Sequence, residues 1–206
     1  MSAPDAPRSE PERPPDLPAW DDDYLDGVAR RLAANYDLER DRTAAGERFD
    51  LYGRLQIQNR KQFVIPQLTY GHHEAVQHLL VARRDGATVA DCERLVELGE
   101  SLAESWIEPD ERHFSTEFVL VLVVPRVDEA VRSFVADFER RTLLKYGYHG
   151  HYELRLAVVA PEREEAVASP ETDVLAALRT WESVDARRED AEGVLDRLRG
   201  LFSRRS

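Results

Sequence analysis

The sequence predicts an α/β fold, a mixed five-stranded sheet with helices on both faces. Apolar residues recur every three to four residues near residue 25, as in a helix, and every second residue near residue 50, as in a strand. Near residue 90 the helical spacing returns. Residues 118–124 are apolar without interruption, which is typical of a central strand covered on two sides. A helical segment separates this run from a second strand, at 152–158, so we expect a parallel strand–helix–strand unit after an antiparallel meander.

Composition divides the 206 residues into three parts. Residues 1–19 hold six of the eleven prolines and show no apolar period, which predicts a disordered tail. Residues 20–184 are expected to form a single α/β domain, because the helix and strand patterns run through them without a linker. Residues 185–206 predict an amphipathic C-terminal helix with a basic end.

The first half of the domain predicts a helix followed by the meander. Acidic residues 21–23 supply capping carboxylates for a helix that begins after Trp20. A half-buried strand follows, because four apolar residues alternate with polar ones: Phe49, Leu51, Leu55 and Ile57. A turn at 59–61 leads to a strand that begins at 63–65. Residues 74–83 favour a strand, since a turn signal at Asp85-Gly86 follows them.

The second half predicts alternating helices and strands. Thr88 to Asp91 resemble a capping box with Asp in place of Glu, and they begin a helix that ends near Glu108-Pro109. Asp128 is expected to cap the crossover helix, and a loop at 146–150 leads into the second central strand. Helices around 171–183 and 186–202 complete the chain.

The charge composition indicates the solvent in which the protein works. The chain has 40 acidic and 28 basic residues, a net charge of −12, and lysine only at Lys61 and Lys145. In concentrated salt the Debye length is about 3 Å, so repulsion among carboxylates is screened. The acid excess therefore favours a halophilic source over a GC-rich mesophile, because GC bias replaces Lys by Arg without adding acids.

Several classes of protein are excluded by what the sequence lacks. A single cysteine, Cys92, excludes an intrachain disulfide and a cysteine-based zinc site, and its place on an apolar helix face predicts a core residue. The first ten residues lack an apolar signal region, and no apolar run is long enough to span a bilayer. We therefore expect a cytoplasmic protein that is not transmembrane. Motifs for dinucleotides, P-loop phosphates and nucleophilic serine are absent.

Five of the six histidines lie in two short segments that also carry glutamate and tyrosine. Imidazole and carboxylate are ligands that suit Zn, Mn or Fe. The candidate ligands of a divalent metal are His72, His73, Glu74, His149, His151 and Glu153. The segments do not match a zincin, because Gln77 holds the position of the second histidine and His78 follows it. The alternative is that these residues are polar loop and strand-end residues, and that the protein uses no cofactor.

The predicted element order also resembles the restriction-endonuclease-like core. That chemistry needs two carboxylates to hold Mg²⁺ and a lysine near the attacking water. Asp50 and Glu74 offer acids, but Glu153-Leu-Arg155 carries arginine in place of the lysine. Because arginine stays protonated, it does not act as a base. The sequence therefore favours a degenerate relative of this fold over an active nuclease.

Two cationic features are candidate contact sites. Lys145 stands beside tyrosines in a chain that otherwise uses arginine, and a lysine there can contact an anion. The C-terminal helix reverses the acidic balance of the chain, and its candidate interaction residues are Arg197, Leu198, Leu201, Phe202 and Arg204. We expect a protein partner rather than nucleic acid for this helix. The alternative is that the helix packs back onto the acidic domain.

Three segments carry a resemblance to a known family: Phe49-Asp-Leu-Tyr-Gly-Arg54, His113-Phe-Ser-Thr-Glu-Phe118 and Leu143-Leu-Lys-Tyr-Gly-Tyr-His-Gly-His-Tyr152. With them, residues 20–183 resemble an uncharacterised halophilic archaeal protein family. The resemblance implies habitat and domain extent, and no activity or catalytic residue. Two hypotheses therefore stay open: a non-enzymatic cytoplasmic domain that acts through protein contacts, and a metal-dependent hydrolase that uses the histidine cluster.

Overall fold

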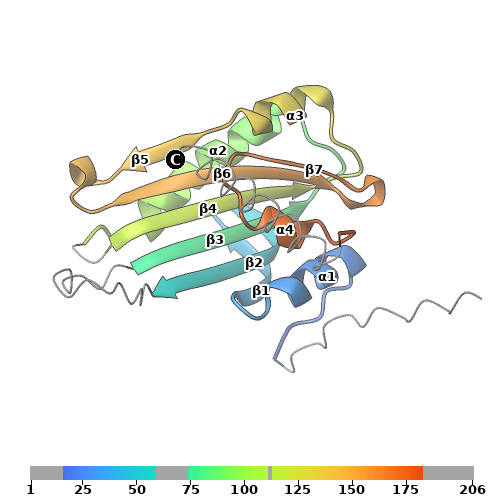
Figure 1. Ribbon diagram of the computed structural model, residues 1–206, viewed down its shortest axis with the longest axis horizontal. Helices are drawn as coiled ribbons and strands as arrows, with labels where there is room; N and C mark the ends of the chain where they lie inside the picture. The colour runs from blue at the N-terminus through green and yellow to red at the C-terminus, as the bar shows by residue number, and fades with distance from the viewer. Residues whose placement is uncertain (1–15, 59–73, 111–112, 183–206) are drawn as a thin grey trace, which may run out of the picture.

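The computed structural model describes residues 16–58, 74–110 and 113–182, and within them one mixed sheet carries helices on both faces (Figure 1). The strands are β1 Asp37–Ala44, β2 Glu47–Gln58, β3 Glu74–Arg83, β4 His113–Val123, β5 Arg140–Leu143, β6 His151–Ala160 and β7 Glu165–Ala168. The helices are α1 Asp23–Leu32, α2 Val89–Trp106, α3 Glu129–Ala136 and α4 Leu175–Leu178, with short 3₁₀ turns η1 Lys145–Gly147 and η2 Pro161–Arg163.

The strand order confirms the predicted fold class. The order is β1-β2-β3-β4-β6-β5, and β7 pairs with the end of β6 that β5 leaves open. β4 and β6 are parallel, as predicted, and an antiparallel meander precedes them, but its first strand is β1, which was not predicted. The helix α2 makes a second crossover, so β3 is also parallel to β4. None of the helices in the described part is long and apolar enough to cross a bilayer.

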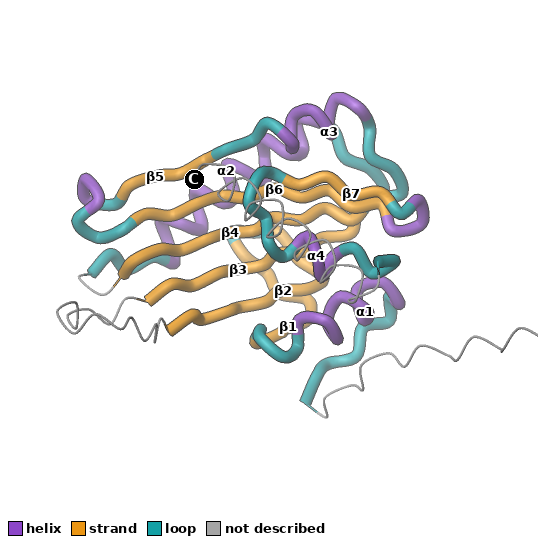
Figure 2. The backbone as a smooth tube through the Cα atoms, in the orientation of Figure 1, coloured by secondary structure: helices purple, strands orange, loops and turns teal. Residues whose placement is uncertain are grey.

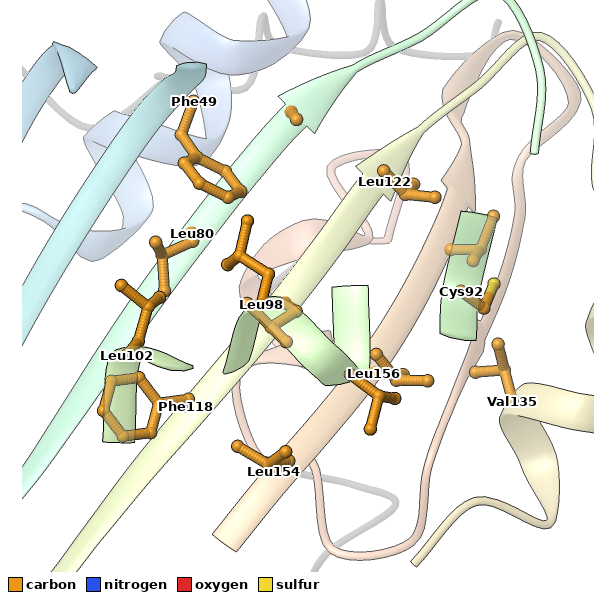
Figure 3. Close-up of a cluster of buried hydrophobic side chains, with 14 of the residues drawn as sticks. Phe49, Leu80, Cys92, Leu98, Leu102, Phe118, Leu122, Val135, Leu154 and Leu156 are labelled. Atoms are coloured by element: carbon orange, nitrogen blue, oxygen red, sulfur yellow. The ribbon is translucent and has the colours of Figure 1, made fainter. Parts of the chain in front are cut away.

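The central strand β4 is buried on both faces, as its apolar run predicts. Phe118, Leu120 and Leu122 belong to the core beneath α2 and α3. The residues between them belong to the core beneath α1 and α4, which lie on the opposite side of the sheet (Figure 2). Figure 3 shows the α2 side, where Leu98 and Leu102 of the helix lie over these strands. Each fully buried side chain of this size contributes about 1.5–3 kcal/mol.

The predicted alternation of apolar and polar residues between the two faces of β2 is wrong at the start of the strand. Phe49 packs in the α2 core, whereas Leu51 packs in the α1 core, although a regular strand would place both on one face. The pairing of β1 with β2 is irregular at this point, where Asp41 and Asp50 are both missing from the register. Asp41 adopts a left-handed φ of 53°. This irregularity turns the first residues of β2 relative to the rest of the strand.

The sheet has seven strands within the described residues, two more than predicted, and β1, β5 and β7 were missed. The predicted turn at 59–61 and strand at 63–65 lie outside the described residues. The C-terminal segment and all but the end of the N-terminal tail also lie outside them.

The helix expected at 171–183 is limited to α4. Beyond α4, the Arg31 guanidinium of α1 donates to the carbonyl oxygens of Arg179, Thr180 and Glu182, at 2.9, 2.7 and 2.9 Å. These carbonyls therefore bond to a side chain instead of extending the helix.

The caps of the first two helices confirm their predicted starts. The Asp22 carboxylate accepts from the backbone N–H of Leu25 at 3.0 Å. Thr88 and Asp91 form a reciprocal capping box, in which each side chain accepts from the backbone N–H of the other residue. Asp128 is the N-cap residue of α3, as predicted, but its side chain makes no capping hydrogen bond.

We predict that Gly150→Ala destabilises the fold by about 3 kcal/mol or more. Gly150 joins η1 to β6 with a φ of +74°, and an added Cβ would lie 2.0 Å from the carbonyl oxygen of Phe114. Gly46→Ala is the matched control, because its φ is +81° and nothing lies within 4 Å of the added Cβ. Gly46→Ala should lower the free energy of unfolding by about 1 kcal/mol, because only the backbone strain of the positive φ contributes. Equal losses in urea unfolding would contradict the clash.

Candidate functional site

A cavity of about 510 Å³ opens on the α2 face of the sheet, at the starts of β3 and β4. Its volume lies in the range of small-molecule sites, about 300–1,000 Å³. Its walls come from β1, β2, β3, β4 and the end of α2, and the residues that carry its chemistry are Arg42, Tyr52, Arg54, His78, Trp106 and His113. We call this cavity the His78 pocket.

His78 lies among the buried residues of the His78 pocket. It is 9% exposed, and its Nδ1 lies 2.8 Å from the hydroxyl oxygen of Tyr52 on the neighbouring strand. Its ring stacks on Phe118 at a centroid distance of 5.0 Å and an interplanar angle of 20°. The Trp106 ring meets it edge-on at 5.1 Å. The imidazole is therefore fixed by aromatic contacts and one hydrogen bond.

The surroundings of His78 keep it uncharged near neutral pH. Burial, with smaller contributions in the same direction from the guanidinium groups of Arg54 and Arg42, lowers its pKa to about 4. Burial also raises the pKa of the Tyr52 hydroxyl. His78 thus lies in the positive field of two arginines, whereas the carboxylates of Glu39 and Asp37 partly offset that field at Tyr52.

The two arginines of the pocket have different environments. The Arg42 guanidinium lies over the Tyr52 ring at 4.3 Å and the Trp106 ring at 5.2 Å, and it pairs with Glu39 at 2.7 Å. Arg54 is half-buried and lies opposite Asp37 in the β1–β2 register. Within the described part of the chain, Arg54 makes no hydrogen bond or ion pair. Its five N–H donors are therefore available to a ligand.

His113 connects the pocket to the hairpin between β5 and β6. Its Nδ1 lies 2.7 Å from the carbonyl oxygen of His149, so this nitrogen donates. Its Nε2 is then free to accept from the Thr116 hydroxyl at 2.9 Å. Both ring nitrogens are engaged, so His113 holds the hairpin against β4.

A second polar cluster lies on the opposite face of the same strands. Gln77 donates to Glu117 at 2.8 Å, and Arg155 lies 3.6 Å from Glu117 and 2.5 Å from Glu153. Burial raises the pKa of Glu117, while Gln77 and Arg155 act in the opposite direction. Arg155 also donates to the carbonyl oxygen of Pro170 at 3.0 Å. With its guanidinium buried among these partners, Arg155 neutralises carboxylates that the sheet buries.

The predicted metal ligands are only partly brought together. His72 and His73 lie outside the described residues, and Glu74 begins β3 in register with His113 of β4. His151 and Glu153 are neighbours, with 3.4 Å between Nε2 and Oε1. His149 lies in the turn before β6, within the loop predicted at 146–150, so it does not share a strand with His151.

The two histidine segments nevertheless reach the same end of the sheet. Glu74, His113 and His151 begin three adjacent parallel strands. Among the described residues, however, no group of three or more His, Cys, Asp or Glu lies close enough to hold a metal ion. Asp50, one acid of the nuclease hypothesis, instead accepts from the Arg83 backbone N–H at the far end of β3, away from Glu153.

The remaining predicted residues divide into exposed, buried and undescribed ones. Lys145 is exposed in the β5–β6 hairpin, beside Tyr146 and Tyr148, which are 97% and 87% exposed. Cys92 is buried in the α2 core, and burial raises its pKa to about 11, so the predicted core position is confirmed. The proposed interaction residues between Arg197 and Arg204 lie outside the described part of the chain.

The sequence analysis missed the residues of the His78 pocket. Arg54, Tyr52 and Trp106 come from two elements and meet only through the strand register and the packing of α2. One signal was present in the sequence. His78 shares its strand face with Leu80, a core position, and a lone histidine there is a candidate for a perturbed pKa.

Comparison with known proteins gives the family of the chain. Residues 21–180 match the family described as Domain of unknown function (DUF8052), so the chain belongs to that family. The matched region begins just before α1 and ends just after α4, and it includes every strand of the sheet. No curated protein and no solved structure matches the chain.

We predict that His78 makes the fold less stable in acid. Its pKa is about 4 in the folded protein, against about 6.5 when unfolded, so the unfolded state binds the proton more tightly. Stability should fall by roughly 3 kcal/mol as the pH falls from about 6.5 towards 4. The variant His78→Phe keeps the ring stacking and should lose most of this dependence in urea unfolding.

Tyr52→Phe is the matched control for this prediction, because it removes the hydrogen bond and leaves His78 to titrate. Its pH dependence should stay close to that of the unmodified protein. An identical acid slope in His78→Phe and the unmodified protein would show that other groups cause the loss.

Proposed function

We propose that this member of the DUF8052 family is a non-enzymatic binding domain that holds a small organic carboxylate in the His78 pocket. The observation that carries the proposal is Arg54, a half-buried guanidinium in the pocket wall with no partner among the described residues. A guanidinium presents a planar fork of N–H donors that matches a carboxylate in two hydrogen bonds.

The other walls of the pocket favour a planar apolar body for this ligand. Trp106, Tyr52 and His78 supply aromatic surface. The positive field that lowers the pKa of His78 also attracts an anion. Asp37 and Glu39 lie on the exposed side of the pocket, so they select against a ligand whose outer end is also anionic.

The roles of the side chains support binding more than turnover. His78 is neutral and fixed between rings, and Arg42 is held by Glu39 and two aromatic faces. The pKa of His78 lies well below the neutral range that general acid–base catalysis favours. We therefore infer that the pocket retains its ligand unchanged.

Benzoate is the probe that tests this proposal. We expect it to bind with a Kd in about the millimolar range, which is typical of about nine non-hydrogen atoms. Binding should shift the NMR signals of the Trp106 indole and the His78 ring. Arg54→Gln should weaken binding about tenfold or more, because a hydrogen bond to a charged group contributes about 1.5–3 kcal/mol.

Two controls separate the carboxylate from the aromatic ring and Arg54 from surface charge. Benzamide, the neutral analogue, should bind equally to the Arg54→Gln variant and the unmodified protein. Arg126→Gln should leave benzoate binding unchanged, because Arg126 lies after β4 with a side chain 68% exposed and pairs with Asp128. Benzoate binding that ignores Arg54, or no binding, would contradict the proposal.

Metal binding is the second candidate function, and a metal-dependent hydrolase is its enzymatic form. It is supported by the position of Glu74, His113 and His151 at the starts of adjacent strands. Against it, Glu153 already lies 3.6 Å from Arg141 and 2.5 Å from Arg155, so these cations compete for the carboxylate. Zn²⁺ titration of the full chain tests it: the proposal requires one bound ion, lost in His151→Ala and kept in His78→Phe.

A further inference from the structure

A groove between α2 and α3 combines an apolar floor with an acidic rim. The cavity measures about 950 Å³, and its floor is formed by Val96, Phe134 and Phe138. The two phenyl rings lie 6.1 Å apart and are half-buried. The rim carries five carboxylates: Glu93, Glu97, Glu100, Asp137 and Glu139. We call this surface the α2–α3 groove.

The charge of the α2–α3 groove is poorly compensated. Arg140 is the one basic residue among those that line it in the described chain, and it pairs with Glu100 at 3.0 Å. The other four carboxylates make no ion pair with any residue that the structure describes. Because an apolar surface lies beside this negative charge, the groove suits an amphipathic segment that is basic on its polar side.

We propose that residues 194–205 of the same chain dock in the α2–α3 groove. This segment carries an apolar stripe at helical spacing: Val194, Leu195, Leu198, Leu201 and Phe202. Four arginines and no acid occur between Arg197 and Arg205. The stripe fits the phenyl rings and Val96, and the arginines fit the unpaired carboxylates of the rim.

The chain is long enough to make this contact. The described residues end at Glu182, next to α4, which lies on the opposite face of the sheet from the groove. The intervening residues 183–193 span up to about 36 Å when extended. The sheet separates the two helix layers, so they lie two layer spacings or about 20 Å apart, and the connection is longer than that.

The segment of the same chain is favoured over that of a second copy. Two sites joined by a short flexible connection meet at an effective concentration in the millimolar range. A second copy reaches that concentration only when the protein itself is millimolar. Docking within one chain therefore occupies the groove first, and a basic partner has to displace the segment.

The scarcity of lysine provides a direct test in the full chain. Arg197→Lys and Arg204→Lys, made together, keep the charge and introduce two amines where the sequence otherwise has only Lys61 and Lys145. A carbodiimide then joins each amine to a carboxylate that it contacts. We expect most cross-links within one chain, from residues 197 and 204 to Glu93, Glu97, Asp137 or Glu139, identified by mass spectrometry.

Charge reversal on one side of the groove completes the test. Glu93→Arg with Glu97→Arg, added to the lysine variant, should reduce the cross-links to Asp137 and Glu139 about fivefold or more, because two attractive charge pairs are replaced by two repulsive ones. Glu162→Arg with Glu164→Arg is the control, because both residues are exposed on the η2 turn, and cross-linking should not change.

Three results would overturn the proposal. Cross-links between two chains would make a second copy the occupant. Cross-links mainly to carboxylates outside the groove would place the segment elsewhere. The charge reversal at Glu93 and Glu97 could also leave the cross-link yields at Asp137 and Glu139 unchanged. That result would show that the groove does not hold the segment.

Discussion

The structure depends on burying three parallel strands on both faces. β3, β4 and β6 alternate large apolar residues between the α2 side and the α1 side, so each helix layer is needed to remove one set from water. This requirement also explains the two crossovers, because parallel neighbours need a connection that passes over a face of the sheet. The meander and the short edge strands then extend the sheet by backbone hydrogen bonds on either side of these buried strands.

Near the starts of these strands polar residues replace the apolar ones. The polar residues on the two faces of the sheet have different surroundings. On the α1 side, Gln77 donates to Glu117, and the Arg155 guanidinium lies 3.6 Å from the same carboxylate, so these residues contact one another across three strands. On the α2 side, the helix ends at Trp106, and His78 and Tyr52 lie beside a cavity. Of the two sides, this one combines neutral polar groups, aromatic surface and an arginine without a partner among the described residues, and for that reason we propose that it binds the ligand.

Local patterns in the sequence predicted the elements that bury their own side chains. The two-sided burial of β4 and the capping box at Thr88 are confirmed because each is encoded by adjacent residues. β1 and β5 were missed, since edge strands with mostly exposed side chains are held by backbone pairing instead of an apolar period. The site was missed for a related reason: Arg54 and Trp106 meet through register and helix packing. The halophilic source stays a prediction.

The central claim is that burial and two guanidinium groups hold His78 neutral inside the pocket. The most direct test is the pKa of the His78 ring, measured by NMR titration of the full chain and assigned with the His78→Phe variant. The account predicts titration at about pH 4, and no change in the ring signal between about pH 7 and pH 5.5. Titration near pH 6.5 would contradict it, because the ring would then be solvated and the pocket field would be absent.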